Sequence, residues 1–257
     1  MPTDFLRIRL AMTGTEPLVT RTLEVPADYS AYELHLALQV SLRYNDYEPF
    51  EFVRTGLTVG VEPAYAGEGL THDGHRYRHA DEVVAGDLWA AVGQALDYTY
   101  DFSRLWGFKV VLLERVARGG EVPVCTQAAE SAPPEDLDSL AAYYGLLIAY
   151  GDASTELHEL AVQILGADFD ARGPGAEGIT DDLAQLFGEE VEPHGTASDD
   201  DDEFPWWDPS KYDEAMRIRA SRREVEERLP GTLDGLRAGE KQAELLRALR
   251  GGDRGRP

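Results

Sequence analysis

The stretch Thr99–Glu114, TYDFSRLWGFKVVLLE, decides the fold, because it contains two apolar runs separated by a turn. Before the turn, the aromatic residues Tyr98, Tyr100 and Phe102 alternate with polar ones. This period of two is typical of a half-buried strand. A second alternating run covers residues 108–112. The stretch therefore predicts two antiparallel strands joined by SRLWG.

Upstream of this hairpin, the sequence predicts further strands and one helix. Ser30 and Glu33 have the spacing of a capping box, and leucines and alanines follow at helical spacing, so residues 31–43 are predicted to be a helix. The remaining upstream elements are predicted to be strands at residues 6–12, 19–25, 51–53 and 57–61, and a short helix at residues 87–92.

Downstream of Pro133 and Pro134, the hydrophobic period changes from two to 3.6, which predicts helices. The predicted helical segments are residues 137–148, residues 157–165 with Ser154 as the cap and Gly166 as the end, and residues 183–187 behind Thr180. Strands followed by helices are typical of the α+β class. We therefore expect a mainly antiparallel sheet with one helix after the second strand, followed by a C-terminal helical segment.

The chain is strongly acidic, with a formal net charge of −24 over 257 residues. Residues 1–190 carry −20 of this charge, with 12 Lys and Arg against 32 Asp and Glu. Such a surface repels phosphate backbones and anionic lipid, so we expect neither direct nucleic-acid binding by the main domain nor membrane binding. Two interpretations of the charge stay open: solubility, or an acidic decoy for a basic or nucleic-acid-binding partner.

The N-terminus and the cysteine content favour a reduced, cytoplasmic protein. The opening residues MPTDFLRIRLAM alternate like a strand and do not have the pattern of a signal peptide. No apolar run approaches the ~18 residues of a membrane span. Cys125 is the single cysteine, so the chain forms no internal disulfide and no thiolate metal cluster.

Composition divides the chain into three parts, of which residues 1–190 are the main domain. The acidic run SDDDDE lies in residues 191–208 and predicts a flexible linker, and residues 209–250 have the pattern of a helical hairpin. Trp206 and Trp207 lie between the acidic run and the hairpin. We expect them to be interaction residues, either against the main domain or against a protein partner.

Three histidines, His72, His75 and His79, form the one cluster with metal-ligating residue types. The neighbouring Asp73-Gly74 pair is typical of a turn, which argues against a rigid ligand set. We therefore interpret the cluster as a solvated loop and expect neither a metal nor another cofactor.

Four residues are candidates for acid–base chemistry: Asp101, Arg104, Glu135 and Asp136. Glu135 and Asp136 have a second interpretation, as caps of the helix predicted from Leu137. Cys125 is interpreted as a buried structural thiol. The sequence contains no P-loop, dinucleotide fingerprint or nucleophile elbow.

Across residues 4–190, the order of these segments resembles the plasmid pRiA4b ORF-3-like family. The resemblance rests on the opening strand and on the following sequence segments: TRTLEVPADYSAYELHLALQVSL (20–42), the YDF…W hairpin with VVLLE, PPED (133–136) and LGADFD (165–170). It implies an α+β fold. The family is met on plasmids and as a passenger of insertion elements, where it has been labelled resolvase-like.

The hairpin departs from the family pattern Tyr-Asp-Phe-Gly-Asp-x-Trp-x-His. Ser103 stands in place of the glycine, Arg104 in place of the second aspartate and Phe108 in place of the histidine. We therefore favour a non-enzymatic interaction protein that binds a protein partner. The alternative is a divalent-metal-dependent hydrolase or nuclease-like enzyme centred on the four acid–base candidates.

Overall fold

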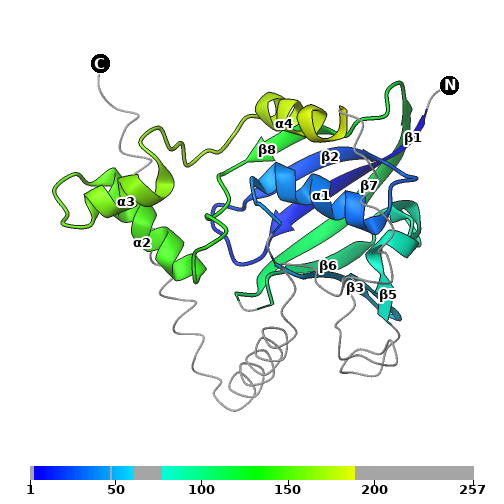
Figure 1. Cartoon of the computed structure of the whole chain (residues 1–257), viewed down its shortest axis with the longest axis horizontal. Coiled ribbons are helices and arrows are strands. Elements are labelled where there is room, and N and C mark those ends of the chain that lie inside the picture. The colour runs from blue at the N-terminus through cyan, green and yellow to red at the C-terminus, as the bar shows by residue number, and fades with distance from the viewer. Residues whose placement is uncertain (1–2, 47, 61–76, 103, 189–257) are drawn as a thin grey trace, which may run out of the picture.

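A computed structural model describes residues 3–46, 48–60, 77–102 and 104–188 (Figure 1). Within these residues, eight strands form one sheet, accompanied by four α-helices. The elements are β1 (Thr3–Met12), β2 (Thr20–Pro26), α1 (Ala31–Leu42), β3 (Phe50–Arg54), β4 (Leu57–Gly60), β5 (Tyr77–His79), β6 (Ala95–Tyr100), β7 (Trp106–Arg118), β8 (Val124–Ala129), α2 (Leu140–Gly151), α3 (His158–Leu165) and α4 (Ala176–Gly188). The predicted α+β class is confirmed.

The predicted hairpin lies at the centre of the sheet. Its strands β6 and β7 are antiparallel, with Tyr98 opposite Phe108 and Leu96 opposite Val110. The strand order is β5-β4-β3-β6-β7-β1-β2-β8, and only the β4–β5 pair is parallel. The hairpin therefore joins the β3–β5 half of the sheet to the half formed by β1, β2 and β8.

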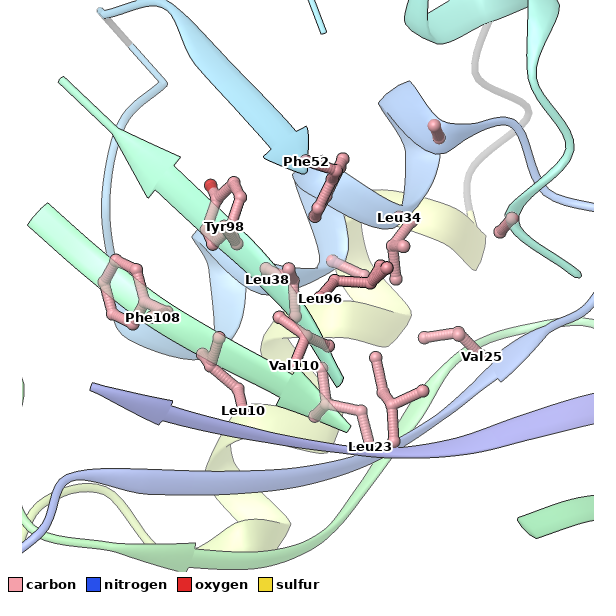
Figure 2. Packing of buried hydrophobic residues seen from close by; sticks show 14 of the residues in the cluster. Leu10, Leu23, Val25, Leu34, Leu38, Phe52, Leu96, Tyr98, Phe108 and Val110 are labelled. Atoms are coloured by element: carbon pink, nitrogen blue, oxygen red, sulfur yellow. The ribbon is translucent and has the colours of Figure 1, made fainter. Parts of the chain in front are cut away.

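Helix α1 packs its apolar face against the sheet. Its capping box forms as predicted: the Glu33 amide donates to Ser30 Oγ at 3.1 Å, and the Ser30 amide donates to Glu33 Oε2 at 2.7 Å. Leu34 and Leu38 are fully buried. Each such leucine stabilises the fold by about 1.5–3 kcal/mol through the area that it removes from water. Figure 2 shows them among the core side chains Leu10, Leu23, Val25, Phe52, Leu96, Tyr98, Phe108 and Val110.

One predicted element was wrong, and one strand of the sheet was missed. The helix predicted at residues 87–92 is replaced by a short 3₁₀ turn at Ala85–Asp87. Strand β8 was not predicted, although it pairs with β2 at the edge of the sheet. Cys125 is the only buried residue of β8, so its alternation is weak.

Two details predicted for the starts of the C-terminal helices were also wrong, namely the cap at Ser154 and the position of Thr180 before its helix. Helix α3 begins at His158 without a side-chain cap, and Ser154 instead donates to the Asp152 carboxylate at 2.6 Å. Thr180 lies inside α4, where its hydroxyl accepts from the Cys125 amide at 3.0 Å. Gly166 ends α3 as predicted.

Helices α2 and α3 form an arm beside the sheet, which we call the α2–α3 arm (residues 140–165; Figure 1). The first turns of α2 anchor it: the Tyr143 hydroxyl donates to the Ser131 carbonyl at 2.9 Å, and Tyr144 accepts from the Glu16 amide at 2.7 Å. Farther out, the His158 ring bonds to the Ala149 carbonyl at 3.0 Å and holds α3 against α2.

Helix α4 returns the chain to the sheet and packs against β8 and α1. Ile179 and Leu183 are fully buried there, and the ring of Phe187 stacks on Tyr29 with centroids 5.3 Å apart. Among the described residues, none of the helices has the length and apolar character needed to cross a membrane.

Candidate functional site

The turn after β6 brings two of the acid–base candidates together. Asp101 is fully buried and has a positive φ of 56°. Its carboxylate accepts from the Arg104 amide at 3.1 Å and from Arg104 Nη1 at 2.6 Å. The Asp101 amide donates to the Pro49 carbonyl at 3.0 Å. The pair therefore closes the turn and fastens it to the segment before β3.

Glu135 meets the same end of the hairpin from the PPED segment. One carboxylate oxygen accepts a short hydrogen bond from the Tyr100 hydroxyl, and the other accepts from the Asn45 amide at 2.7 Å and from Asn45 Nδ2 at 3.1 Å. Trp106 Nε1 donates to the Glu135 carbonyl at 3.2 Å. Glu135 therefore connects three segments of the chain.

The interpretation of Glu135 and Asp136 as helix caps was wrong. Helix α2 begins at Leu140, and its cap is Ser139, whose hydroxyl accepts from the Ala142 amide at 3.2 Å. Asp136 is exposed. The pKa of the Arg104 guanidinium is raised, mainly by its hydrogen bond with Asp101. The negative charge of Asp136 adds a smaller contribution in the same direction.

A second polar cluster, which the sequence analysis missed, lies between α1 and the sheet. His35 is fully buried, with Nδ1 2.8 Å from the Tyr98 hydroxyl and Nε2 2.6 Å from Asp46 Oδ1. Gln39 Nε2 donates to the same Tyr98 hydroxyl at 2.8 Å, and the Tyr32 hydroxyl donates to Asp46 Oδ2 at 3.2 Å. We call these five residues the His35 chain.

The donors and acceptors of the His35 chain fix the state of the imidazole. In a neutral ring with its proton on Nε2, Nδ1 is an acceptor, and the Tyr98 hydroxyl then donates to it while accepting from Gln39. The Asp46 carboxylate only accepts, so His35 Nε2 carries the ring proton. Burial lowers the pKa of His35, against the opposing effect of Asp46, which favours this neutral ring. Phe50 stacks on the ring with centroids 3.6 Å apart.

A buried arginine was also missed. Arg21 in β2 is 1% exposed, and it donates only to backbone carbonyls, through Nε to Ser41 at 2.7 Å and through Nη1 to residues 20, 129 and 130. Burial lowers the pKa of this guanidinium. Its bonds tie the end of α1 to β2 and β8, which is a structural role.

The histidine loop and the tryptophan pair fall mostly outside the described residues. This applies to His72, His75, Trp206 and Trp207. His79 is described, and its Nδ1 lies 3.3 Å from Asp81 Oδ2. In the described part of the chain, no group of three or more His, Cys, Asp or Glu is placed to hold a metal ion. Cys125 is buried, and burial raises the pKa of its thiol, in agreement with a structural role.

Comparison with known proteins gives relatives without an assigned activity. An uncharacterized protein, y4hQ, from Sinorhizobium fredii is 26% identical over 190 residues, which cover 72% of this chain and 94% of the relative. The crystal structure of a protein of unknown function, MM3350, from Methanosarcina mazei Go1 is also 26% identical. It matches with a TM-score of 0.59 over 68% of this chain and 97% of that one.

The chain belongs to the plasmid pRiA4b ORF-3-like protein family, whose family model matches residues 4–174. Its YDF…W and PPED segments, far apart in sequence, meet through the bonds of Tyr100 and Trp106 to Glu135. Phe108, which stands where we expected a family histidine, packs against Tyr98 with ring centroids 5.4 Å apart.

Replacing Glu135 with glutamine should destabilise the fold, because the amide nitrogen then faces donors from Tyr100 or Asn45. We expect a loss of about 1–3 kcal/mol in the free energy of unfolding, measured with urea. The matched control is Asp136→Asn at the neighbouring exposed position, expected to change stability by less than about 0.5 kcal/mol. Equal stability of the two variants would contradict the structural role of Glu135.

Stability should fall with acid because of His35. Its pKa in the folded state is lowered below the ordinary value of about 6.5 by burial. The contribution of a neutral His35 is therefore complete above this pH and is lost as the pH falls toward the folded-state pKa. As the pH falls below about 6.5, the wild type should lose more stability than His35→Gln. Parallel urea titrations check this, and identical slopes for the two proteins would exclude it.

Proposed function

We propose that this member of the ORF-3-like family is a non-enzymatic, cytoplasmic protein-binding module whose α2–α3 arm takes up a basic amphipathic helix. One observation carries the proposal: the described residues leave an apolar surface of the arm uncovered. Leu157, Leu160 and Ile164 have the spacing of one helix face and are 59%, 45% and 41% exposed. Their exposure at these positions is typical of a partner-binding surface.

Helix α2 extends this apolar surface. The sequence LAAYYGLLIAYG contains no charged residue, yet Leu147 and Ile148 are only half-buried. A helix that is apolar on all sides is normally enclosed by other elements. The contacts of α2 and α3 with each other and with the sheet therefore leave part of the apolar area of the arm uncovered.

The charges around the arm favour a basic partner. From residue 119 to residue 171 the chain contains no Lys or Arg but ten Asp or Glu. Asp152, Glu156 and Glu159 are exposed on or next to the arm. An apolar stripe edged only by carboxylates complements a helix that carries leucines on one side and lysines or arginines beside them.

The bonding of the acid–base candidates supports binding over catalysis. Asp101 and Glu135 are buried, and both are bonded to groups that hold the turn and the loops in place. A catalytic carboxylate must reach a proton of the substrate directly or through one water. A metal-dependent hydrolase at this end of the hairpin has less support, because the same carboxylates are needed for the fold.

A synthetic helical peptide with leucines on one face and lysines on the other, and without tryptophan, tests the proposal. The anisotropy of a dye attached to this peptide should show micromolar binding to the full chain at low salt. The binding should weaken as the salt concentration increases. The double change Leu160→Glu and Ile164→Glu should weaken binding at least about tenfold, or 1.4 kcal/mol. The control is Val92→Glu with Leu113→Glu, which adds the same charge at apolar positions that are 57% and 40% exposed. Equal weakening in the control would contradict the role of the arm.

A further inference from the structure

We infer that the α2–α3 arm is covered by the C-terminal segment of the same chain, residues 204–250, so that a partner must displace this segment to bind. The inference deepens the proposed function by naming what occupies the same surface in the absence of a partner. It rests on the uncovered apolar face of the arm, on charge, and on the reach of the chain.

The charge distribution selects the C-terminal segment. Residues 204–250 contain ten Lys and Arg against nine Asp and Glu. Within them, residues 216–223, MRIRASRR, include four arginines and no acid. This stretch of the segment therefore carries the positive charge that the arm, with its exposed Asp152, Glu156 and Glu159, does not have.

The same charges argue against a second copy of the arm as the occupant. Two arms packed face to face would bring like charges together around one apolar surface, which is unfavourable at moderate salt. The C-terminal segment supplies apolar groups without this repulsion. Its apolar side chains include Trp206, Trp207, Leu233, Leu236, Leu245, Leu246 and Leu249.

The connection between α4 and the segment is long on the scale of a domain of about 190 residues. Fifteen residues, 189–203, separate Gly188 from the segment. At about 3.3 Å per residue, they span up to roughly 50 Å when extended. Attachment through a connection of this length corresponds to an effective concentration on the order of millimolar. Even weak complementarity is then sufficient to keep the arm covered.

The tryptophans of the chain provide a direct test in the full-length protein. Trp89 and Trp106 are each 3% exposed, so acrylamide, a neutral quencher, should reach neither of them. The quenchable fraction of the tryptophan fluorescence therefore reports on Trp206 and Trp207. In the wild type we expect this fraction to be small, and in Leu160→Glu with Ile164→Glu it should rise to about half of the emission. Val92→Glu with Leu113→Glu should leave it unchanged.

The leucine–lysine peptide provides a second test. Excess peptide should also raise the quenchable fraction of the tryptophan fluorescence of the wild type. A large quenchable fraction in the wild type would overturn the inference. A small fraction that does not rise in Leu160→Glu with Ile164→Glu would overturn it as well. Peptide binding with open tryptophans would leave the proposed function standing. Release by the arm variant without any peptide binding would instead contradict the proposed function alone. Shielding that increases with protein concentration, together with a dimer in sedimentation, would place the segment on a second copy and would also overturn the inference.

Discussion

The hydrogen bonds of His35 with Tyr98 and Asp46 are the constraint on which the rest of the structure depends. They join the buried face of α1 to the central strand β6 and to the segment before β3. With that segment held, Asn45 reaches Glu135, and the Glu48 amide reaches the Tyr100 hydroxyl at 3.2 Å. Because His35, Tyr98 and Glu135 are buried, leaving one of them unpaired would cost about 1–3 kcal/mol, so the network is sensitive to the loss of their bonds.

The polar residues of this arrangement have a structural role, although the same residue types are also typical of catalytic sites. A carboxylate, a histidine and a tyrosine in series are also the parts of a proton relay. Here the series lies under α1, with His35 at 0% exposure and Phe50 stacked on its ring. The same chemistry that orients groups in an active site orients loops in this protein. The surface to which we assign the function in our proposal is the apolar and acidic α2–α3 arm.

The sequence predicted the elements whose burial is one-sided and regular. The alternation around Tyr98 and Phe108 indicated the hairpin, and Ser30 with Glu33 indicated the start of α1. Strand β8 was missed because Cys125 is its only buried residue. The cap at Ser154 was wrong because a hydroxyl near a helix start also bonds to other groups, here to the Asp152 carboxylate.

The candidate site was predicted only in part, because its contacts join segments far apart in the chain. Asp101 and Arg104 are close in sequence, and their pairing was within reach of pattern reasoning. The bond from Tyr100 to Glu135 crosses 35 residues, and the one from Tyr98 to His35 crosses 63. The signal for His35 was its spacing of three and seven from Leu38 and Leu42, which places it on the core face of α1.

Nitrogen-15 NMR of the His35 ring tests the central claim most directly. The ring should be neutral at about pH 7.5, with its proton on Nε2 and an unprotonated Nδ1 that accepts from Tyr98, and it should take up a second proton only below its ordinary pKa. The Asp46→Asn variant should alter the Nε2 signal more than the Nδ1 signal, because Asp46 bonds to Nε2. A ring that titrates at its ordinary pKa of about 6.5, or one with the proton on Nδ1, would contradict the buried network as the basis of the fold.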